Sequence, residues 1–162
     1  MKKDKRRGFP LVELLIVIAI IVVLISAAAP KFSQVLMSAK ETAAITTVKT
    51  LHTAQAQYSS QFGRYALSLA ELGPPTGGQP GPDGADLIPR DLSLGSKGGY
   101  NYVLEGTPTG YKLTASPTAF GNTGRRCFYS DQTMVIHENW GQEPATASSP
   151  ELGAAPAAKP KS

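Results

Sequence analysis

The residues with the clearest potential for chemistry lie close to the N-terminus. A basic cluster ends at Arg7 and is followed by Gly8 and Phe9. Glu13 is the single charge inside the apolar run that comes next, Leu11 to Ala29. If the bond between Gly8 and Phe9 were cut, the new α-amino group would lie four residues from Glu13, which is one turn on a helix. This spacing therefore predicts an ammonium–carboxylate pair in an apolar setting.

The apolar run has the length of a membrane span. A helix from Phe9 to Ala29, rising about 1.5 Å per residue, would reach roughly 31 Å, about the thickness of the hydrocarbon layer of a bilayer. The basic head should stay on the cytoplasmic side, so the rest of the chain should face outward. A carboxylate near the start of such a helix costs on the order of 2 to 3 kcal/mol. We therefore expect Glu13 to have a positively charged partner and a function.

Residues 7–18, with the sequence RGFPLVELLIVI, resemble the processing site and N-terminal helix of type IV prepilins, the family that includes the pseudopilins of type II secretion. In that family a membrane peptidase cuts after the glycine and methylates the new N-terminal residue. The resemblance implies that Gly8 is the last leader residue, that Phe9 becomes the methylated N-terminus, and that Glu13 is the carboxylate needed for assembly. Pro30 also matches the family, and we expect it to kink the helix.

An ordinary secretory signal peptide or signal anchor shares the basic head and the apolar run. Ala27-Ala28-Ala29 offers such a signal peptide a small-residue cleavage site. Pro30 would then follow the scissile bond, where its ring and tertiary amide obstruct a protease, and Glu13 would have no role. The prepilin interpretation is favoured because it accounts for both residues.

Beyond Pro30 the apolar pattern continues as a one-sided helix. Apolar side chains recur at three- and four-residue steps or their multiples, and charged and amide side chains lie off this stripe. The stripe consists of Val35, Ala39, Ile45, Val48, Leu51, Tyr58 and Phe62, with Lys40, Glu41, Lys49 and Gln57 outside it. Gly63 is a plausible C-terminal stop. One long helix is therefore predicted from Phe9 to about Phe62, apolar all round in its first half and amphipathic in its second.

The chain after this helix predicts a small head with an antiparallel sheet. Residues 100–105 and 111–115 alternate apolar and polar side chains around a Gly/Pro-containing turn, which is typical of a hairpin. Residues 126–129 and 134–138 predict a second pair of strands, whereas the Pro/Gly-rich residues 77–84 should form an exposed loop. A sheet of three or four strands packed on the second half of the helix gives an α+β fold. This is the pilin-like layout that the resemblance implies.

The chain is accordingly expected to have five parts. The tail has almost no apolar side chain larger than alanine, so it cannot bury enough surface to offset the entropy of ordering, and we expect it to be disordered. The parts are a leader peptide (1–8), a transmembrane and polymerisation helix (9–30), an amphipathic helix half (31–63), a head with a loop and an antiparallel sheet (64–140), and a Pro/Ala-rich tail (141–162).

Charge and motifs argue against several classes of function. The formal net charge of +4 resides in the leader, so the remainder is formally neutral and gives no reason to expect nucleic-acid binding. His52 and His137 belong to no spacing that would hold a metal, and no hydrolase or phosphate-binding motif is present. We therefore predict that the protein is not an enzyme and needs no cofactor.

Three aspartates and the single cysteine could suggest a metal site or a disulfide, but neither is expected here. Asp83, Asp86 and Asp91 suggest calcium, but three scattered carboxylates fall short of the six to eight oxygens that this ion takes, so no metal site is expected. Cys127 is the single cysteine and cannot form an internal disulfide. It is expected to be a small buried side chain in a strand.

The sequence thus predicts a structural subunit that is cleaved, N-methylated and polymerised through its N-terminal helix into a type IV pilus. The alternatives are a pseudopilin of a type II secretion system and a monomeric membrane-anchored binding protein. The expected partners are copies of the chain itself, a prepilin peptidase/methyltransferase, an inner-membrane assembly platform, and membrane lipid before assembly. The expected location is the inner membrane in a single pass, and then an extracellular pilus or a periplasmic pseudopilus.

Overall fold

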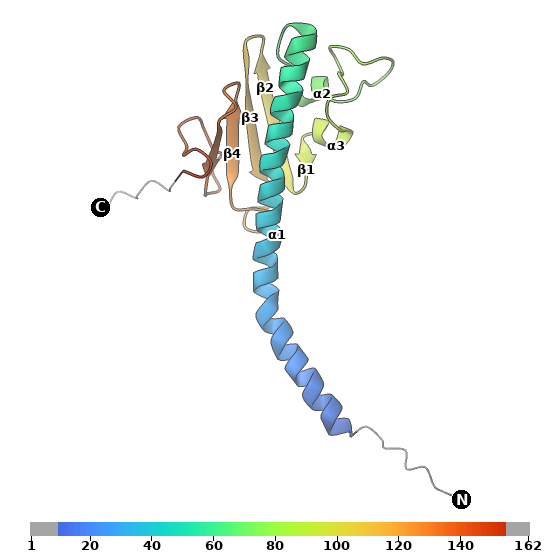
Figure 1. The fold of residues 1–162 in the computed structure, drawn as a ribbon, viewed down its shortest axis with the longest axis vertical. Helices are drawn as coiled ribbons and strands as arrows, with labels where there is room; N and C mark the ends of the chain where they lie inside the picture. The colour runs from blue at the N-terminus through green and yellow to red at the C-terminus, as the bar shows by residue number, and fades with distance from the viewer. Residues whose placement is uncertain (1–9, 155–162) are drawn as a thin grey trace, which may run out of the picture. The chain divides into compact units, whose positions relative to one another are not determined.

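The computed structural model describes residues 10–154 of the 162-residue chain, and it shows the α+β architecture expected from the sequence. A long helix, α1 (Leu11–Phe62), is followed by a five-stranded antiparallel sheet (Figure 1). The chain divides into two compact units, Met1–Val35 and Leu36–Ser162, and α1 contributes residues to both. The predicted long helix is confirmed over the described residues.

In the first unit the helix begins directly after a proline. The Pro10 carbonyl accepts a hydrogen bond from the Glu13 N–H at 2.9 Å, and proline is well tolerated here because the first N–H groups of a helix have no partner within it. The hydroxyl of Ser26 donates to the Val23 carbonyl at 2.8 Å, so this polar group is satisfied within the helix. The helix continues through residues 27–30, whose side chains are outside the described set, and the kink at Pro30 stays a prediction.

The C-terminal end of α1 lies where the sequence predicts it. Gly63 adopts a φ of 71° and its N–H donates to the Ser59 carbonyl at 2.9 Å, which is the left-handed helix ending that favours glycine. The side chain of Gln55 then fixes the returning chain, because its amide donates to the Ala66 carbonyl at 3.0 Å and accepts from the Ala66 N–H at 2.9 Å.

The sheet has five strands, whereas three or four were expected. Its strands are β1 (Ser96–Lys97), β2 (Tyr100–Thr107), β3 (Gly110–Pro117), β4 (Cys127–Asp131) and β5 (Ile136–Asn139), antiparallel and in sequence order. Both predicted hairpins are confirmed, with Leu104 opposite Leu113 and Ser130 opposite Ile136. The additional strand, β1, has only two residues, which is too short for an alternating pattern to reveal. Two short helices, α2 (Leu69–Leu72) and α3 (Arg90–Ser93), lie in the segment between α1 and the sheet.

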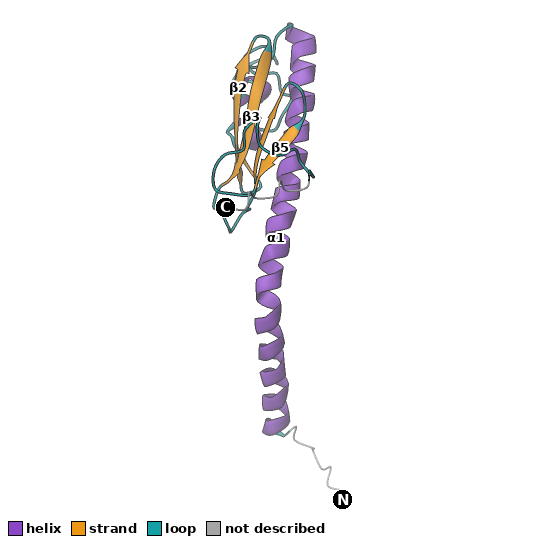
Figure 2. Cartoon of the chain, turned by 90° about the vertical axis from the view of Figure 1, so that its left-hand side faces the viewer, coloured by secondary structure: helices purple, strands orange, loops and turns teal. Residues whose placement is uncertain are grey.

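The second half of α1 packs along one face of the sheet and forms the core of the head (Figure 2). Val48, Leu51 and Tyr58 are buried there, as the helical stripe predicts. The predicted stripe of buried residues is wrong at its N-terminal end, because Val35 and Ala39 are exposed and Glu41 is buried. Burial on α1 begins only at Met37 in the described structure, and Glu41 is buried because it binds Arg126.

The prediction of a disordered tail from Gly141 is wrong for residues 141–154. The Glu138 N–H donates to the Pro150 carbonyl at 2.8 Å, and the Leu152 N–H donates to the Ile136 carbonyl at 2.7 Å. This segment is held by main-chain pairing, which requires no large apolar side chain and therefore leaves little trace in the composition. Residues 155–162 lie outside the described residues.

Candidate assembly surface

The first half of α1 presents apolar side chains in every direction. From Leu11 to Ile25, the large apolar side chains are between 46% and 78% exposed. By length and composition this helix could cross a membrane. An exposed apolar surface of this extent is rare on soluble monomers and indicates contact with lipid or with other protein surfaces.

Glu13 is the single acidic residue in the first turn of α1, and its side chain is exposed. The N–H groups at the start of a helix carry partial positive charge, so a carboxylate at this position is favoured even before it meets a partner. Gly8 and Phe9 lie outside the described residues. The pairing of Glu13 with an α-amino group at Phe9 stays a prediction.

A shallow apolar groove runs along one face of this helix. The small side chain of Ala19 lies between larger neighbours on adjacent turns of the helix. The residues that line the groove are Leu15, Ile16, Ala19, Ile20, Val23 and Leu24. Apolar side chains of another helix could pack into such a groove as knobs pack into holes.

The second half of α1 has an exposed face rich in threonine. The hydroxyls of Thr42, Thr46 and Thr50 each donate to the carbonyl four residues earlier, at 3.0 Å. Thr47 and Thr53 do the same at 2.9 and 3.2 Å. Because these hydroxyl protons are already bonded within the helix, another surface could cover this face without leaving them unsatisfied.

His52 is held in the core rather than in a site that could bind substrate. Its Nδ1 lies 2.7 Å from the Tyr111 hydroxyl and its Nε2 lies 2.9 Å from the Ser130 hydroxyl. Ser130 donates its one proton to the Val135 carbonyl at 2.6 Å, so Nε2 must carry the hydrogen that bonds to Ser130. His52 therefore cannot accept the Ser130 proton, as the base of a serine nucleophile would have to do.

The three loop aspartates do not gather into a site. Among residues 10–154, no three His, Cys, Asp or Glu side chains come together as metal ligands would. Asp83 lines a pocket in the Pro/Gly loop, whereas Asp91 accepts a hydrogen bond from the Leu92 N–H at 2.8 Å. Asp86 is exposed, and its φ is 55°.

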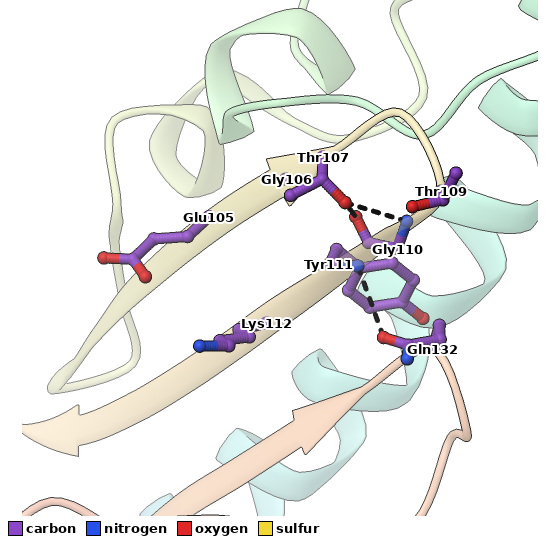
Figure 3. A pocket seen from close by; sticks show the side chains of 8 residues that line it. All are labelled: Glu105, Gly106, Thr107, Thr109, Gly110, Tyr111, Lys112 and Gln132. Atoms are coloured by element: carbon purple, nitrogen blue, oxygen red, sulfur yellow. Dashed lines mark hydrogen bonds between the residues drawn. The ribbon is translucent and has the colours of Figure 1, made fainter.

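Another pocket, of about 330 Å³, lies beside the turn between β2 and β3 (Figure 3). Glu105 is its one carboxylate, and Gln132 reaches it from the turn between β4 and β5, where its side-chain oxygen accepts from the Tyr111 N–H at 3.4 Å. None of the residues that the sequence singled out for chemistry lines this pocket.

Sequence reasoning missed a buried ionic cluster centred on Arg126. Its Nε donates to Glu41 of α1 at 2.8 Å and its Nη1 donates to Glu138 of β5 at 3.0 Å, while both carboxylates are buried. Its guanidinium also lies 5.5 Å from the centre of the Phe128 ring and 5.0 Å from that of Trp140. One signal was available, because Glu41 lies four residues after Met37 and three before Ala44, both of which are buried on the same helix face.

The prokaryotic N-terminal methylation motif matches residues 3–29, which include Gly8, Phe9 and Glu13. This motif supports the resemblance to the type IV pilin family. It is also 41% identical over 69 residues to the type IV major pilin protein PilA of Myxococcus xanthus. That match covers 43% of this chain and spans only 31% of the length of the relative. No solved structure matches the chain.

The pilin-like interpretation made from the sequence is therefore confirmed. The matched motif covers the whole apolar run, and the described structure adds the helix and the antiparallel sheet that the family resemblance implies. Cleavage at Gly8, methylation at Phe9 and the assembly role of Glu13 are implied by the motif, and each is taken up below as a proposal.

Proposed function

We propose that this chain is a structural subunit of a type IV pilus, released from its leader between Gly8 and Phe9 and polymerised through the first half of α1. The observation that carries this proposal is the combination of an apolar helix exposed on all sides with a single carboxylate, Glu13, in its first turn. A membrane anchor needs the apolar surface but gains nothing from the carboxylate. A polymer uses both.

Processing supplies the charge that Glu13 lacks. Cleavage after Gly8 creates an α-amino group at Phe9, and methylation leaves this amine basic and able to donate hydrogen bonds. In the bilayer, the carboxylate has a cost of on the order of 2 to 3 kcal/mol. In the apolar interior of a filament it would meet the amine of a neighbouring copy, where screening is weak and attraction between opposite charges is strong.

The same helix surface would serve two successive environments. Before assembly the exposed side chains between Leu11 and Ile25 contact lipid, and after assembly they contact the equivalent helices of other copies. The groove around Ala19 offers a place where side chains of a neighbouring helix could pack. A prepilin peptidase/methyltransferase and an assembly platform in the inner membrane are the further partners that this route requires.

A pilus is favoured over the pseudopilus of type II secretion. The similarity to a major pilin supports this choice, although it extends over less than half of the chain. In either case the head would face outward, since the basic leader residues should keep the N-terminus cytoplasmic. The pseudopilus remains the second candidate.

Substitution of Glu13 tests the polymer role. Glu13→Leu should insert, be cleaved and accumulate in membranes normally, yet filament yield should fall at least about tenfold if the pair contributes more than 1.4 kcal/mol to assembly. Glu13→Gln should also be impaired, because it keeps the size of the side chain but removes the charge. The measurement is immunoblotting of membrane and sheared-filament fractions in cells that lack the native gene.

The matched control is Ile18→Leu, a volume-conserving change further along the same helix at a residue that does not line the groove around Ala19. This variant should yield filaments at the level of the unmodified protein. Filaments in normal amounts from Glu13→Leu would reject the assembly role of the carboxylate and favour a monomeric membrane-anchored protein.

A further inference from the structure

The segment from Ser149 to Leu152 closes one edge of the sheet. An edge strand such as β5 would otherwise present unpaired main-chain groups to other chains. Glu151 instead forms an antiparallel bridge with His137, flanked by the main-chain bonds from Glu138 to Pro150 and from Leu152 to Ile136. The side chain of His137 adds a further bond, from Nδ1 to the Ser149 carbonyl at 2.7 Å. Figure 1 shows this last segment beside the β4 side of the sheet.

The same segment contacts both faces of the sheet. Ala145 is buried with Cys127 and Tyr129 in a small cluster separate from the main core. Leu152 packs against the main core, which lies between the sheet and α1. The chain therefore passes around the β5 edge from one face to the other. Ala145 packs with Cys127, which is 1% exposed and whose thiol also donates to the Gly141 carbonyl at 3.6 Å.

A polar path connects this segment to α1. The Gly153 N–H donates to Oε1 of Glu138 at 3.4 Å, and Oε2 of the same carboxylate accepts from Arg126 at 3.0 Å. Arg126 in turn binds Glu41 of α1 at 2.8 Å. Contacts of the last described residues are thus coupled to the charge cluster that holds the helix to the sheet.

We propose that residues 143–153 form a C-terminal strap that opens as one unit, and that its opening exposes the Cys127 thiol and the β5 edge together while the remainder of the head stays folded. The strap is held by a few main-chain bonds, by three hydrogen bonds with side chains of β5, and by one alanine and one leucine. The main core is much larger and is built from α1, the two short helices and four strands. Segments with few buried apolar contacts open locally at a lower cost than global unfolding. The strap thus controls access to a nucleophile and to a sheet edge that could pair with another strand.

The accessibility of Cys127, the single cysteine, reports directly on this opening. The full processed chain would be purified in detergent and labelled with the thiol reagent DTNB, with and without denaturant. Burial raises the pKa of the Cys127 thiol, which slows the reaction further in the closed state. We expect labelling of the unmodified protein to be at least about 100-fold slower in native buffer than in denaturant, because only the open fraction reacts.

Two variants open the strap from different ends. Ala145→Glu places a charge in the cluster around Cys127, and Leu152→Ala removes packing on the opposite face of the sheet. Each should accelerate labelling at least about tenfold while the far-ultraviolet circular dichroism of the head is retained. Ala147→Glu is the matched control, because Ala147 is exposed in the same segment, and its labelling rate should equal that of the unmodified protein.

If Ala145→Glu fails to fold, Leu152→Ala still tests the proposal. Leu152 packs against the main core and does not belong to the cluster of Cys127, Tyr129 and Ala145. The proposal is overturned if Leu152→Ala leaves the labelling rate unchanged, since the two ends would then open independently. It is also overturned if labelling of the unmodified protein occurs only by global unfolding, with the denaturant dependence of the whole head. None of these results depends on filament formation, so they are separate from the test of the proposed function.

Discussion

At the scale of single residues, the geometry around His52 fixes its protonation state. The Ser130 hydroxyl donates its hydrogen bond to the Val135 carbonyl, so Nε2 of His52 is a donor toward Ser130. Nδ1 must then accept from the Tyr111 hydroxyl. Burial lowers the pKa of His52 below its ordinary value of 6.5, against the opposing attraction of Asp131. A protonated imidazole would require Tyr111 to turn its hydrogen away from the ring, inside the core.

We expect this arrangement to make the head less stable in mild acid. Because the folded pKa of His52 lies below 6.5, its contribution to stability is fully present above pH 6.5 and is lost as the pH falls through the folded pKa. The melting temperature of the head should therefore fall between about pH 7 and about pH 5. His52→Gln cannot titrate and should show a smaller decrease over the same range. Equal decreases in the two proteins would show that other groups cause the acid sensitivity.

At the scale of secondary-structure elements, Arg126 is the residue that joins the helix to the strand edge. It links Glu41 of α1 with Glu138 of β5 in a buried cluster. Arg126→Leu would leave two buried carboxylates without their cation, and the head should lose about 3 to 5 kcal/mol of stability in urea unfolding. Arg125→Leu is the control, because Arg125 is exposed, and it should change stability by no more than about 0.5 kcal/mol. A small effect of Arg126→Leu would mean that the carboxylates are solvated or protonated without cost.

The elements that the sequence predicted well are those defined by side chains. Gly63 ends the helix because glycine takes the left-handed conformation without strain. Alternation reveals the hairpin of β2 and β3 because its inner face is apolar. The C-terminal strap escaped prediction because main-chain bonds hold it and its buried side chain, Ala145, is small. Glu41 was assigned to the solvent because a charge was assumed to be exposed, although its helical spacing placed it among buried residues.

The candidate site was predicted from a different kind of signal. The proposed cleavage point and the proposed role of Glu13 rest on residue types at fixed separations, and the methylation motif matches the same segment, residues 3–29. Periodicity could not have revealed this site, because the first half of α1 is apolar on every face. The carboxylate stands out only because charge in such a helix is costly.

At the scale of the whole molecule, the two units have opposite requirements. The head buries its own apolar side chains, and among the described residues no buried side-chain nitrogen or oxygen lacks a hydrogen-bond partner. The first unit buries none of its described side chains between residues 10 and 26, so its stability must come from lipid or from other copies. This exposed apolar surface supports the proposal that the chain assembles with other copies of itself.

Mass spectrometry of protein recovered from sheared cell-surface filaments tests this account most directly. We expect copies of this chain to make up the filaments, and each copy to begin at Phe9 with one methyl group on its α-nitrogen. Filaments without this chain, or protein that begins at Met1 or at Pro30, would contradict it.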